Sequence, residues 1–290
     1  NRQRAGFRGG SFGVARGSSQ EMDEGHLPAT YSALAALVAL EVDLAADVDG
    51  SALVLALRSL QQEDGSFRSS FSDSTCDLRF TYCACAVSTL LGDWSGVDKR
   101  KAAAYIERCY YVYTTILQCF FCAQDFDGGV GLAPGREACA GPMYCAVASL
   151  ELMGTLDALS ASRRQGLLEW CVNRQVGAGG GSGFQGRPNK AEDSCCSFWV
   201  GATLALLGGL HLVDKARARQ FHISCENKTC GFAKIPGAPS DVLHSFYSLA
   251  WLSLSGEAGV QEDMDVALGV TRGAAERLGR HRMRWKEHAP

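Results

Sequence analysis

One type of segment recurs five times along the chain, and this repeat limits the folds that the sequence can adopt. In each copy an aromatic residue is followed by an apolar run rich in small residues. The copies begin at Tyr31, Tyr82, Tyr144, Phe198 and Phe246. Most follow a glycine-rich turn, and a charged segment, such as 53–62 or 163–175, precedes the turn. A repeat of this kind is typical of folds in which each unit buries its apolar face against the next unit.

The two segments of each unit differ in their apolar pattern. The small-residue segments are apolar nearly all round, which predicts buried helices, whereas the charged segments carry a single apolar stripe, which predicts helices at the surface. The sequence therefore predicts an all-α fold in which an inner ring of helices is surrounded by an outer ring.

Composition and charge narrow the class of protein. With 290 residues and 47% hydrophobic content the chain can bury a full core, and its longest apolar stretch, 33–40, is too short to span a bilayer. A net charge of −3 gives no general attraction to nucleic acid, and the basic cluster 280–286 is interpreted as a solvated tail. The thirteen cysteines fit reduced thiols of a cytoplasmic protein better than a disulfide framework.

The spacing of the repeats suggests the domain limits. We expect one domain over 1–277, a basic tail over 278–290, and N-terminal helices missing before a chain that starts without Met. The interval between the second and third aromatic anchors exceeds its neighbours by roughly a dozen residues. We assign the excess to an insertion at 110–123, which is either a genuine surface loop or a retained intron in the gene model. Sequencing the transcript distinguishes the two.

Three residues offer the ligand types that zinc prefers. Asp193, Cys195 and His244 supply one oxygen, one thiolate and one imidazole, which leaves one of four zinc positions open for a substrate. Both segments lie at the start of a predicted inner helix in adjacent units, so the ring is expected to bring them together. A histidine that merely satisfies the core remains the alternative.

Two cations lie just before the candidate ligands. Arg187 offers a forked donor and Lys190 a point charge, a combination suited to a phosphate-rich leaving group. A solvated basic loop is the alternative reading of this segment.

The chain resembles the β subunits of the protein prenyltransferases, and specifically the type I geranylgeranyltransferase subfamily. The resemblance rests on the segments 186–190, 193–204, 231–234 and 241–244, in the family's order and spacing, and extends from about Gly6 to about Arg277. It implies an α/α toroid and an obligate helical-repeat α subunit as partner.

The resemblance also implies a reaction. A geranylgeranyl group would pass from geranylgeranyl diphosphate to the cysteine of a C-terminal CaaX motif ending in Leu or Phe, on proteins such as Rho- and Rac-type small GTPases. Zinc at Asp193, Cys195 and His244 would activate that cysteine. Arg187 and Lys190 would stabilise charge on the departing diphosphate.

Further roles follow from matching positions in the family. The isoprenoid pocket would be lined by Arg79, Tyr82, Cys145 and Trp199, while His26 and Arg79 would lie near the carboxylate of the peptide substrate. For the aromatic residues, an ordinary place in the core is the alternative.

Two positions separate the geranylgeranyl type from the farnesyl type. Farnesyltransferases tend to have Tyr just before the zinc histidine and, ten residues before that histidine, an Asp that serves magnesium. Here these positions hold Leu243 and Lys234. The ammonium of Lys234 would take the place of magnesium beside the diphosphate, so Mg²⁺ is not expected to be required.

Three positions depart from the family pattern. Cys139 replaces a histidine and Cys196 replaces a tyrosine, both of which contact the diphosphate in the family, and Thr75 replaces an acidic residue. Losing each diphosphate contact would cost about 2 to 4 kcal/mol of transition-state stabilisation. Cys196 could also compete for the metal.

Several functions therefore remain open at this stage. The leading one is a catalytic geranylgeranyltransferase β subunit. The others are an impaired or non-catalytic relative that acts as a binding module, a farnesyltransferase β subunit, and a toroid with structural zinc related to terpene cyclases or complement-like domains. The last is disfavoured because the sequence lacks an Asp-rich cyclase motif.

Overall fold

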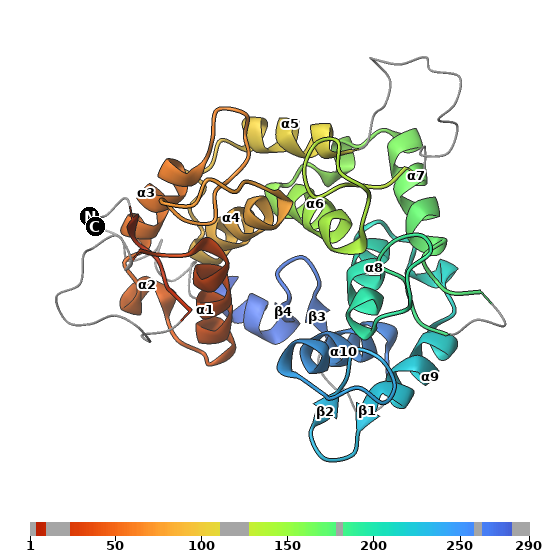
Figure 1. The fold of residues 1–290 in the computed structure, drawn as a ribbon. Coiled ribbons are helices and arrows are strands. Elements are labelled where there is room, and N and C mark those ends of the chain that lie inside the picture. The colour runs from red at the N-terminus through yellow and green to blue at the C-terminus, as the bar shows by residue number, and fades with distance from the viewer. Residues whose placement is uncertain (1–3, 10–23, 111–127, 178–181, 258–262, 280–290) are drawn as a thin grey trace.

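Helices arranged in two concentric layers make up most of the molecule (Figure 1). The computed structural model describes residues 4–9, 24–110, 128–177, 182–257 and 263–279. The predicted α/α toroid of inner and outer helices is confirmed.

The inner layer consists of the small-residue helices. They are α1 (Leu27–Ala39), α4 (Leu78–Leu91), α6 (Ala140–Met153), α8 (Ser194–Leu206) and α10 (Val242–Ser255). Each packs against the next along the chain, from α1 through α4, α6 and α8 to α10. Most side chains of α4, α6 and α8 are buried, as expected for helices that are apolar nearly all round.

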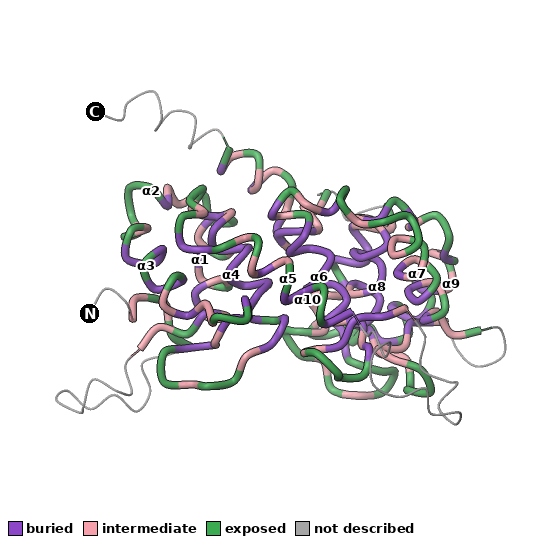
Figure 2. Tube along the Cα trace, turned by 90° about the horizontal axis from the view of Figure 1, so that it is seen from above, coloured by how far each residue is buried: buried purple, intermediate pink, exposed green. Residues whose placement is uncertain are grey.

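The outer layer consists of the charged helices. They are α3 (Gly50–Leu60), α5 (Lys99–Cys109), α7 (Ala161–Val172) and α9 (Lys215–Cys225). Each buries only part of its surface, as α5 does with Ala102, Tyr105, Ile106 and Cys109. Seen from above, the inner and outer helices lie at about the same level, so that the two layers together form a flat slab (Figure 2).

Short elements complete the structure. They are α2 (Leu44–Asp47), two 3₁₀ turns (Leu156–Ala158 and Leu210–Leu212), the strands β1 (Glu226–Asn227), β2 (Gly231–Phe232), β3 (Met264–Asp265) and β4 (Val270–Thr271), and helical residues at 272–279. β1 pairs with β2 and β3 with β4, both antiparallel, with Glu226 opposite Phe232 and Met264 opposite Thr271. The repeat pattern did not predict these two-residue strands.

The glycine loops repeat as regularly as the helices. Three of them are closed by two backbone bridges, one to the end of the outer helix and one near the start of the next inner helix, as in the pairs Gln175–Phe184 and Gln185–Glu192. In the loop after α9, the pairing of β1 with β2 takes the place of the first bridge, and Ala233 bridges to Ser240. In the second unit, Tyr110 bridges to Val130. The expected insertion at 110–123 begins at Tyr110, but 111–127 lie outside the described residues, so it stays a prediction.

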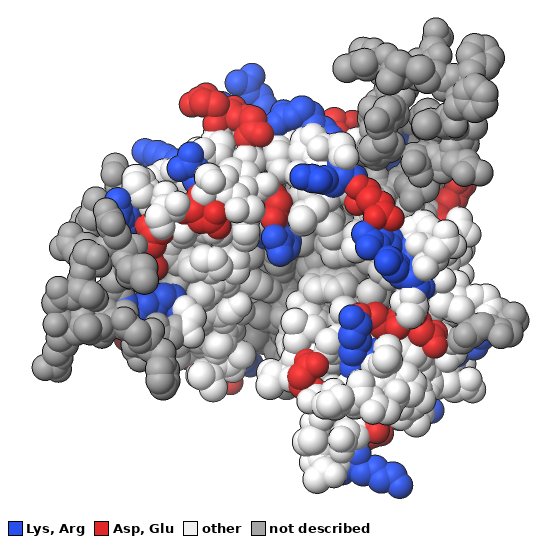
Figure 3. Space-filling model, in the orientation of Figure 1, with Lys and Arg blue, Asp and Glu red and all other residues white. Residues whose placement is uncertain are grey.

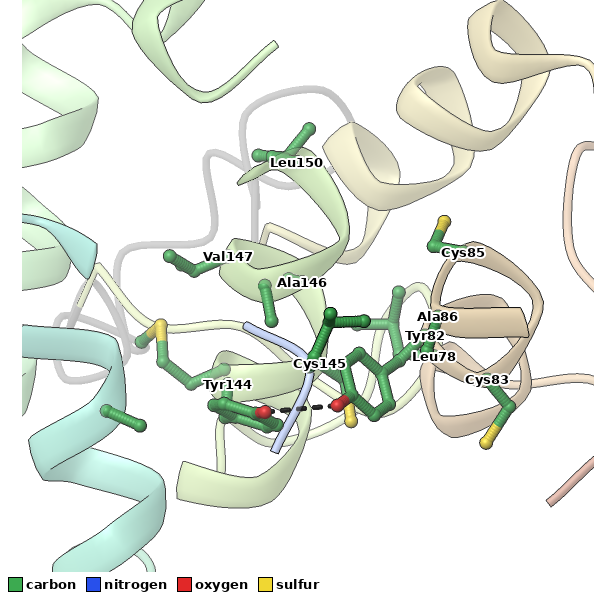
Figure 4. Packing of buried hydrophobic residues seen from close by; sticks show 14 of the residues in the cluster. Leu78, Tyr82, Cys83, Cys85, Ala86, Tyr144, Cys145, Ala146, Val147 and Leu150 are labelled. Carbon is green, nitrogen blue, oxygen red and sulfur yellow. Dashed lines mark hydrogen bonds between the residues drawn. The ribbon is translucent and has the colours of Figure 1, made fainter. Parts of the chain in front are cut away.

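Aromatic residues connect the inner helices around the centre. The rings of Tyr31 and Tyr82 lie 5.4 Å apart, those of Tyr82 and Tyr144 5.3 Å, and those of Tyr144 and Phe198 5.4 Å. The hydroxyl groups of Tyr82 and Tyr144 are hydrogen-bonded at 3.1 Å (Figure 4). The fifth anchor differs, because Phe246 is 46% exposed and its neighbour Tyr247 packs against Phe198 instead.

The β3–β4 hairpin projects into the centre of the arc of helices (Figure 1). Tyr31, Tyr82 and Tyr144 donate hydrogen bonds to the carbonyl oxygens of Leu268, Ala267 and Val266. Because β4 also contacts α1 and β3 contacts α10, the hairpin joins the first inner helix to the last.

Other predictions concern the thiols and the membrane. Every cysteine among the described residues is a free thiol. Among these residues, no helix combines the length and the apolar character needed to cross a bilayer.

His222 on α9 is a buried histidine that is not among the predicted site residues. Its ring lies 6.3 Å from that of Trp251 in a stacked arrangement, and neither ring nitrogen has a hydrogen-bond partner among the described residues. Burial lowers the pKa of His222 from 6.5 to about 4. The folded protein therefore holds this ring neutral at physiological pH.

This burial predicts a pH-dependent stability. Between pH 6.5 and 4 the unfolded chain takes up a proton at His222 that the folded chain does not, so the free energy of unfolding falls with falling pH, by about 2 kcal/mol at pH 5. We expect His222→Leu to remove this part of the difference between urea unfolding curves at pH 7.5 and 5. The exposed His211, changed to Leu, is the control and should leave the difference unchanged. An unaltered pH dependence in His222→Leu would contradict the prediction.

Candidate metal centre

An aspartate begins three of the five inner helices. Asp77, Asp193 and Asp241 are the N-cap residues of α4, α8 and α10, and each side chain accepts a hydrogen bond from a backbone N–H of the first turn. This is the ordinary function of a capping carboxylate. Its consequence is that carboxylates lie at equivalent points of successive units.

The predicted metal ligands lie at two of these helix starts. Asp193 caps α8, Cys195 is the second residue of that helix, and His244 is in the first turn of α10. The Nε2 atom of His244 lies 3.4 Å from Oδ1 of Asp193, and both side chains are only about 15% exposed. An oxygen donor from the start of α8 and a nitrogen donor from the start of α10 therefore approach each other.

The imidazole of His244 is oriented by a carboxylate that sequence reasoning missed. Asp241 accepts a hydrogen bond from the backbone N–H of His244 at 2.8 Å, and its Oδ2 lies 2.6 Å from Nδ1 of the same residue. These hydrogen bonds lower the pKa of Asp241. The signal was present in the sequence as Asp-x-x-His at a helix start, where a capping carboxylate faces the third helical residue.

A second thiol belongs to the same cluster. Asp193, Cys195 and Cys196 place one carboxylate oxygen and two sulfur atoms within 4.8 Å of one another. The pKa of the Cys195 thiol is raised well above its usual value, first by the hydrogen bond with Cys196, then by burial and by the charge of Asp193. Without a cation the thiol therefore stays protonated, and binding of a metal there would release its proton.

Lys234 is the basic residue beside the cluster. Its ammonium lies 3.4 Å from Oδ2 of Asp193, and its carbonyl oxygen accepts a hydrogen bond from the backbone N–H of Ser194. The neighbouring turn depends on Gly231, which has a φ of +95° and where a Cβ atom would clash with Ser245. Oδ1 of Asp193 thus faces His244, and Oδ2 faces Lys234.

The basic loop before α8 contacts the start of α6. Arg187 forms an ion pair with Glu137 at 2.6 Å, and Lys190 is exposed. Ala140 donates a backbone hydrogen bond to the carbonyl oxygen of Gly186, which ties the loop to α6. Glu137 was not singled out in the sequence, because its partner lies fifty residues away.

Cys139 and Cys196, two of the departures from the family pattern, both have their sulfur atoms near Gly186. A Cβ atom built on this glycine would be 3.2 Å from the sulfur of Cys196 and 3.8 Å from that of Cys139. Cys139 is the N-cap residue of α6 and makes no side-chain capping bond. The two substitutions therefore affect one small region.

The residues predicted for the isoprenoid pocket are distributed over α4, α6 and α8. Tyr82 and Cys145 are buried, and Tyr82 is held by the hydrogen bonds described above. The ring of Trp199 lies 5.1 Å from that of Tyr144 and 4.2 Å from that of Tyr247. Tyr247 was missed because Phe246 fits the repeat pattern better.

The residues predicted near the peptide carboxylate lie at the starts of α1 and α4. The guanidinium of Arg79 binds both carboxylate oxygens of Asp77, with a shortest distance of 2.6 Å, while the side chain stays 58% exposed. His26 is exposed at the N-cap position of α1. Charged side chains of both signs line the rim of the hollowed face in Figure 3.

The fold and this cluster define an α/α toroid with a candidate metal centre at the starts of its inner helices. Residues 1–270 match the profile of the family described as the prenyltransferase alpha-alpha toroid domain. The chain belongs to this prenyltransferase family.

The similarity to individual proteins supports membership of this family. The chain is 41% identical over 263 residues to the geranylgeranyl transferase type-1 subunit beta of Arabidopsis thaliana, covering 88% of this chain but 65% of that protein. It is 34% identical over 275 residues to the subunit of the same name from Dictyostelium discoideum, covering 90% of this chain and 72% of that protein. The chain thus spans a little under two thirds of the Arabidopsis relative.

A solved structure has the same fold. The chain matches Candida albicans protein geranylgeranyltransferase-I complexed with GGPP with a TM-score of 0.79 and 23% identity, over 91% of this chain and 76% of that one. At this identity the match shows the fold alone.

The Asp241–His244 contact predicts an effect on metal binding. We expect Asp241→Ala to weaken zinc binding about 10- to 100-fold, because the imidazole loses the carboxylate that orients it. Zinc affinity can be measured by competition with a chromophoric chelator. Asp214→Ala is the matched control, since it also removes a helix cap, on α9, but lies outside the cluster. Equal affinities of the two variants would refute the orienting role.

Proposed function

We propose that this chain is the β subunit of a type I protein geranylgeranyltransferase, which acts in the cytoplasm with a separate prenyltransferase α subunit. It would transfer a geranylgeranyl group from geranylgeranyl diphosphate to the cysteine of C-terminal CaaX motifs ending in Leu or Phe. The observation that carries the proposal is that Asp193 lies close to the thiol of Cys195, to the imidazole of His244 and to the ammonium of Lys234. Family membership and the names of the relatives support it.

The donor set fits zinc. One carboxylate, one thiol and one imidazole are ligands that zinc accepts in catalytic sites with an open position. Since Nδ1 of His244 bonds to Asp241, Nε2 is the nitrogen left to bind a metal, and it faces Asp193. Asp193, Cys195 and His244 would hold the ion, which when bound lowers the pKa of a coordinated substrate thiol.

Three cations are available for the diphosphate. Arg187 and Lys190 lie on the loop before α8, and Lys234 lies beside Asp193. Their charges would stabilise the negative charge that grows on the leaving group. Arg187 and Lys234 are at present paired with Glu137 and Asp193, so a bound diphosphate would compete with these carboxylates for them.

The aromatic interior suits a long apolar chain. Tyr82, Cys145 and Trp199 would line the isoprenoid site, together with Tyr247, which packs on Trp199. Arg79 and His26 would bind the carboxylate of the peptide. The exposed side chain of Arg79 is compatible with this role, since its pairing with Asp77 holds the guanidinium in a fixed orientation.

A second candidate function is an impaired or non-catalytic subunit that binds its α partner or a lipid without turnover. The observation that favours it is the replacement of two expected diphosphate contacts by Cys139 and Cys196, both adjacent to Gly186. Transfer assays separate the two candidates.

The central prediction is single-turnover transfer by the chain co-expressed with a prenyltransferase α subunit. With zinc bound, we expect geranylgeranyl transfer to CaaX peptides ending in Leu, in preference to farnesyl transfer to peptides ending in Ser. Asp193→Ala and His244→Ala should each lose both zinc and activity, whereas Asp214→Ala should retain them. A zinc-loaded complex without transfer would instead support the binding module, and preference for farnesyl would refute the subtype.

Lys234 generates a separate prediction about magnesium. We expect Lys234→Asp to lower the transfer rate about 100-fold without added magnesium, because a cation beside the diphosphate is lost. Millimolar Mg²⁺ should restore much of the rate, since the new carboxylate can hold the ion. Lys228→Asp, on the exposed turn between β1 and β2, is the control with the same change of charge. If magnesium rescues neither the rate nor the affinity for diphosphate, Lys234 does not have this role.

A further inference from the structure

Two consecutive thiols lie in the first turn of α8, and the sulfur atoms of both lie near the carboxylate of Asp193. The carboxylate of Asp193 and the sulfur atoms of Cys195 and Cys196 all lie within 4.8 Å of one another. Among the described residues, this is the one group of three such donors. Zinc ligands in a tetrahedral site are separated by about 3.3 to 3.8 Å, so modest side-chain rotations would bring all three to one ion.

The surroundings of Cys196 hold its sulfur at this place. Cys196 is 7% exposed, and the absence of a side chain at Gly186 leaves room for its sulfur. The carbonyl oxygen of Gly186 is in turn bonded to Ala140 at the start of α6. The thiol therefore lies between α8 and a loop that α6 fixes, and it points toward the cluster.

The charges around the cluster also fit a second thiolate. A carboxylate and two thiolates carry three negative charges, one more than the charge of a zinc ion balances. The ammonium of Lys234, 3.4 Å from Oδ2 of Asp193, supplies the remaining positive charge.

We infer that Cys196 is a fourth ligand of the metal, so that the resting site is closed by Asp193, Cys195, Cys196 and His244. This inference rests on the zinc site of the proposed function. It implies that a substrate thiol enters by exchange: its proton passes to the departing Cys196 thiolate as its own sulfur takes the vacated position. The tyrosine expected at 196 offers no comparable soft donor.

The inference is tested by counting sulfur ligands on the metal-loaded chain, co-expressed with an α subunit. In the wild type, X-ray absorption at the zinc edge should show two sulfur ligands. After replacement of zinc by Co²⁺, the thiolate charge-transfer band of Cys196→Ser should be about half as intense as that of the wild type. Metal binding to Cys196→Ser should also release one proton fewer. Cys139→Ser, which alters the neighbouring thiol beside Gly186, is the matched control and should leave the band unchanged.

Each outcome decides the inference. Two sulfur ligands and a halved band support it. One sulfur ligand in the wild type, with a band unchanged in Cys196→Ser but absent in Cys195→Ser, overturns it and leaves the zinc site of the proposed function intact. Failure of the wild type to take up zinc or Co²⁺ overturns both. The absorption measurement needs no variant, so a folding defect in Cys196→Ser does not prevent the decision.

Discussion

The carboxylates that cap the inner helices are the interaction on which the rest of the structure depends. Asp77, Asp193 and Asp241 each satisfy backbone N–H groups that have no partner within their own helix. The second oxygen of each carboxylate remains available for another contact. That of Asp77 binds Arg79, that of Asp193 faces Lys234, and that of Asp241 orients His244. The carboxylates that cap the inner helices thus also place the polar groups of the candidate site at one end of the inner layer.

The same repeat also determines which part of the molecule is shielded from water. The tyrosines of α1, α4 and α6 lie five residues after their caps, and their hydroxyl groups bond to one another and to the β3–β4 hairpin. Burial without these partners would be costly for a hydroxyl group. The hairpin therefore lets polar aromatic residues occupy the buried centre of the inner layer.

Asp193 is the residue at which the separate parts of the site meet. It caps α8, lies beside two thiols, and contacts His244 and Lys234. Because the carboxylate is largely buried, its charge acts on these neighbours with little screening by water. Cys196, one of the departures from the family pattern, lies within this group.

The sequence by itself determined the repeat, the two layers of helices and the kinds of ligand. These follow from local patterns: apolar periodicity, glycine turns and capping residues act within a few residues of each other. The sequence also pointed to Asp193, Cys195 and His244, since equivalent positions in successive units are expected to be neighbours. The roles assigned to Arg187, Lys190, Tyr82 and Trp199 remain predictions.

Only the tertiary structure decided which groups touch. Three examples join residues far apart in the chain. Arg187 forms an ion pair with Glu137, and Tyr247, in place of Phe246, packs against Phe198. The central hairpin accepts hydrogen bonds from the tyrosines of the inner helices. The sulfur of Cys196, which lies close to Gly186, is a further example. Such contacts depend on how far one helix is rotated and shifted against the next, and that is set by the packing of the whole core, which no local pattern encodes.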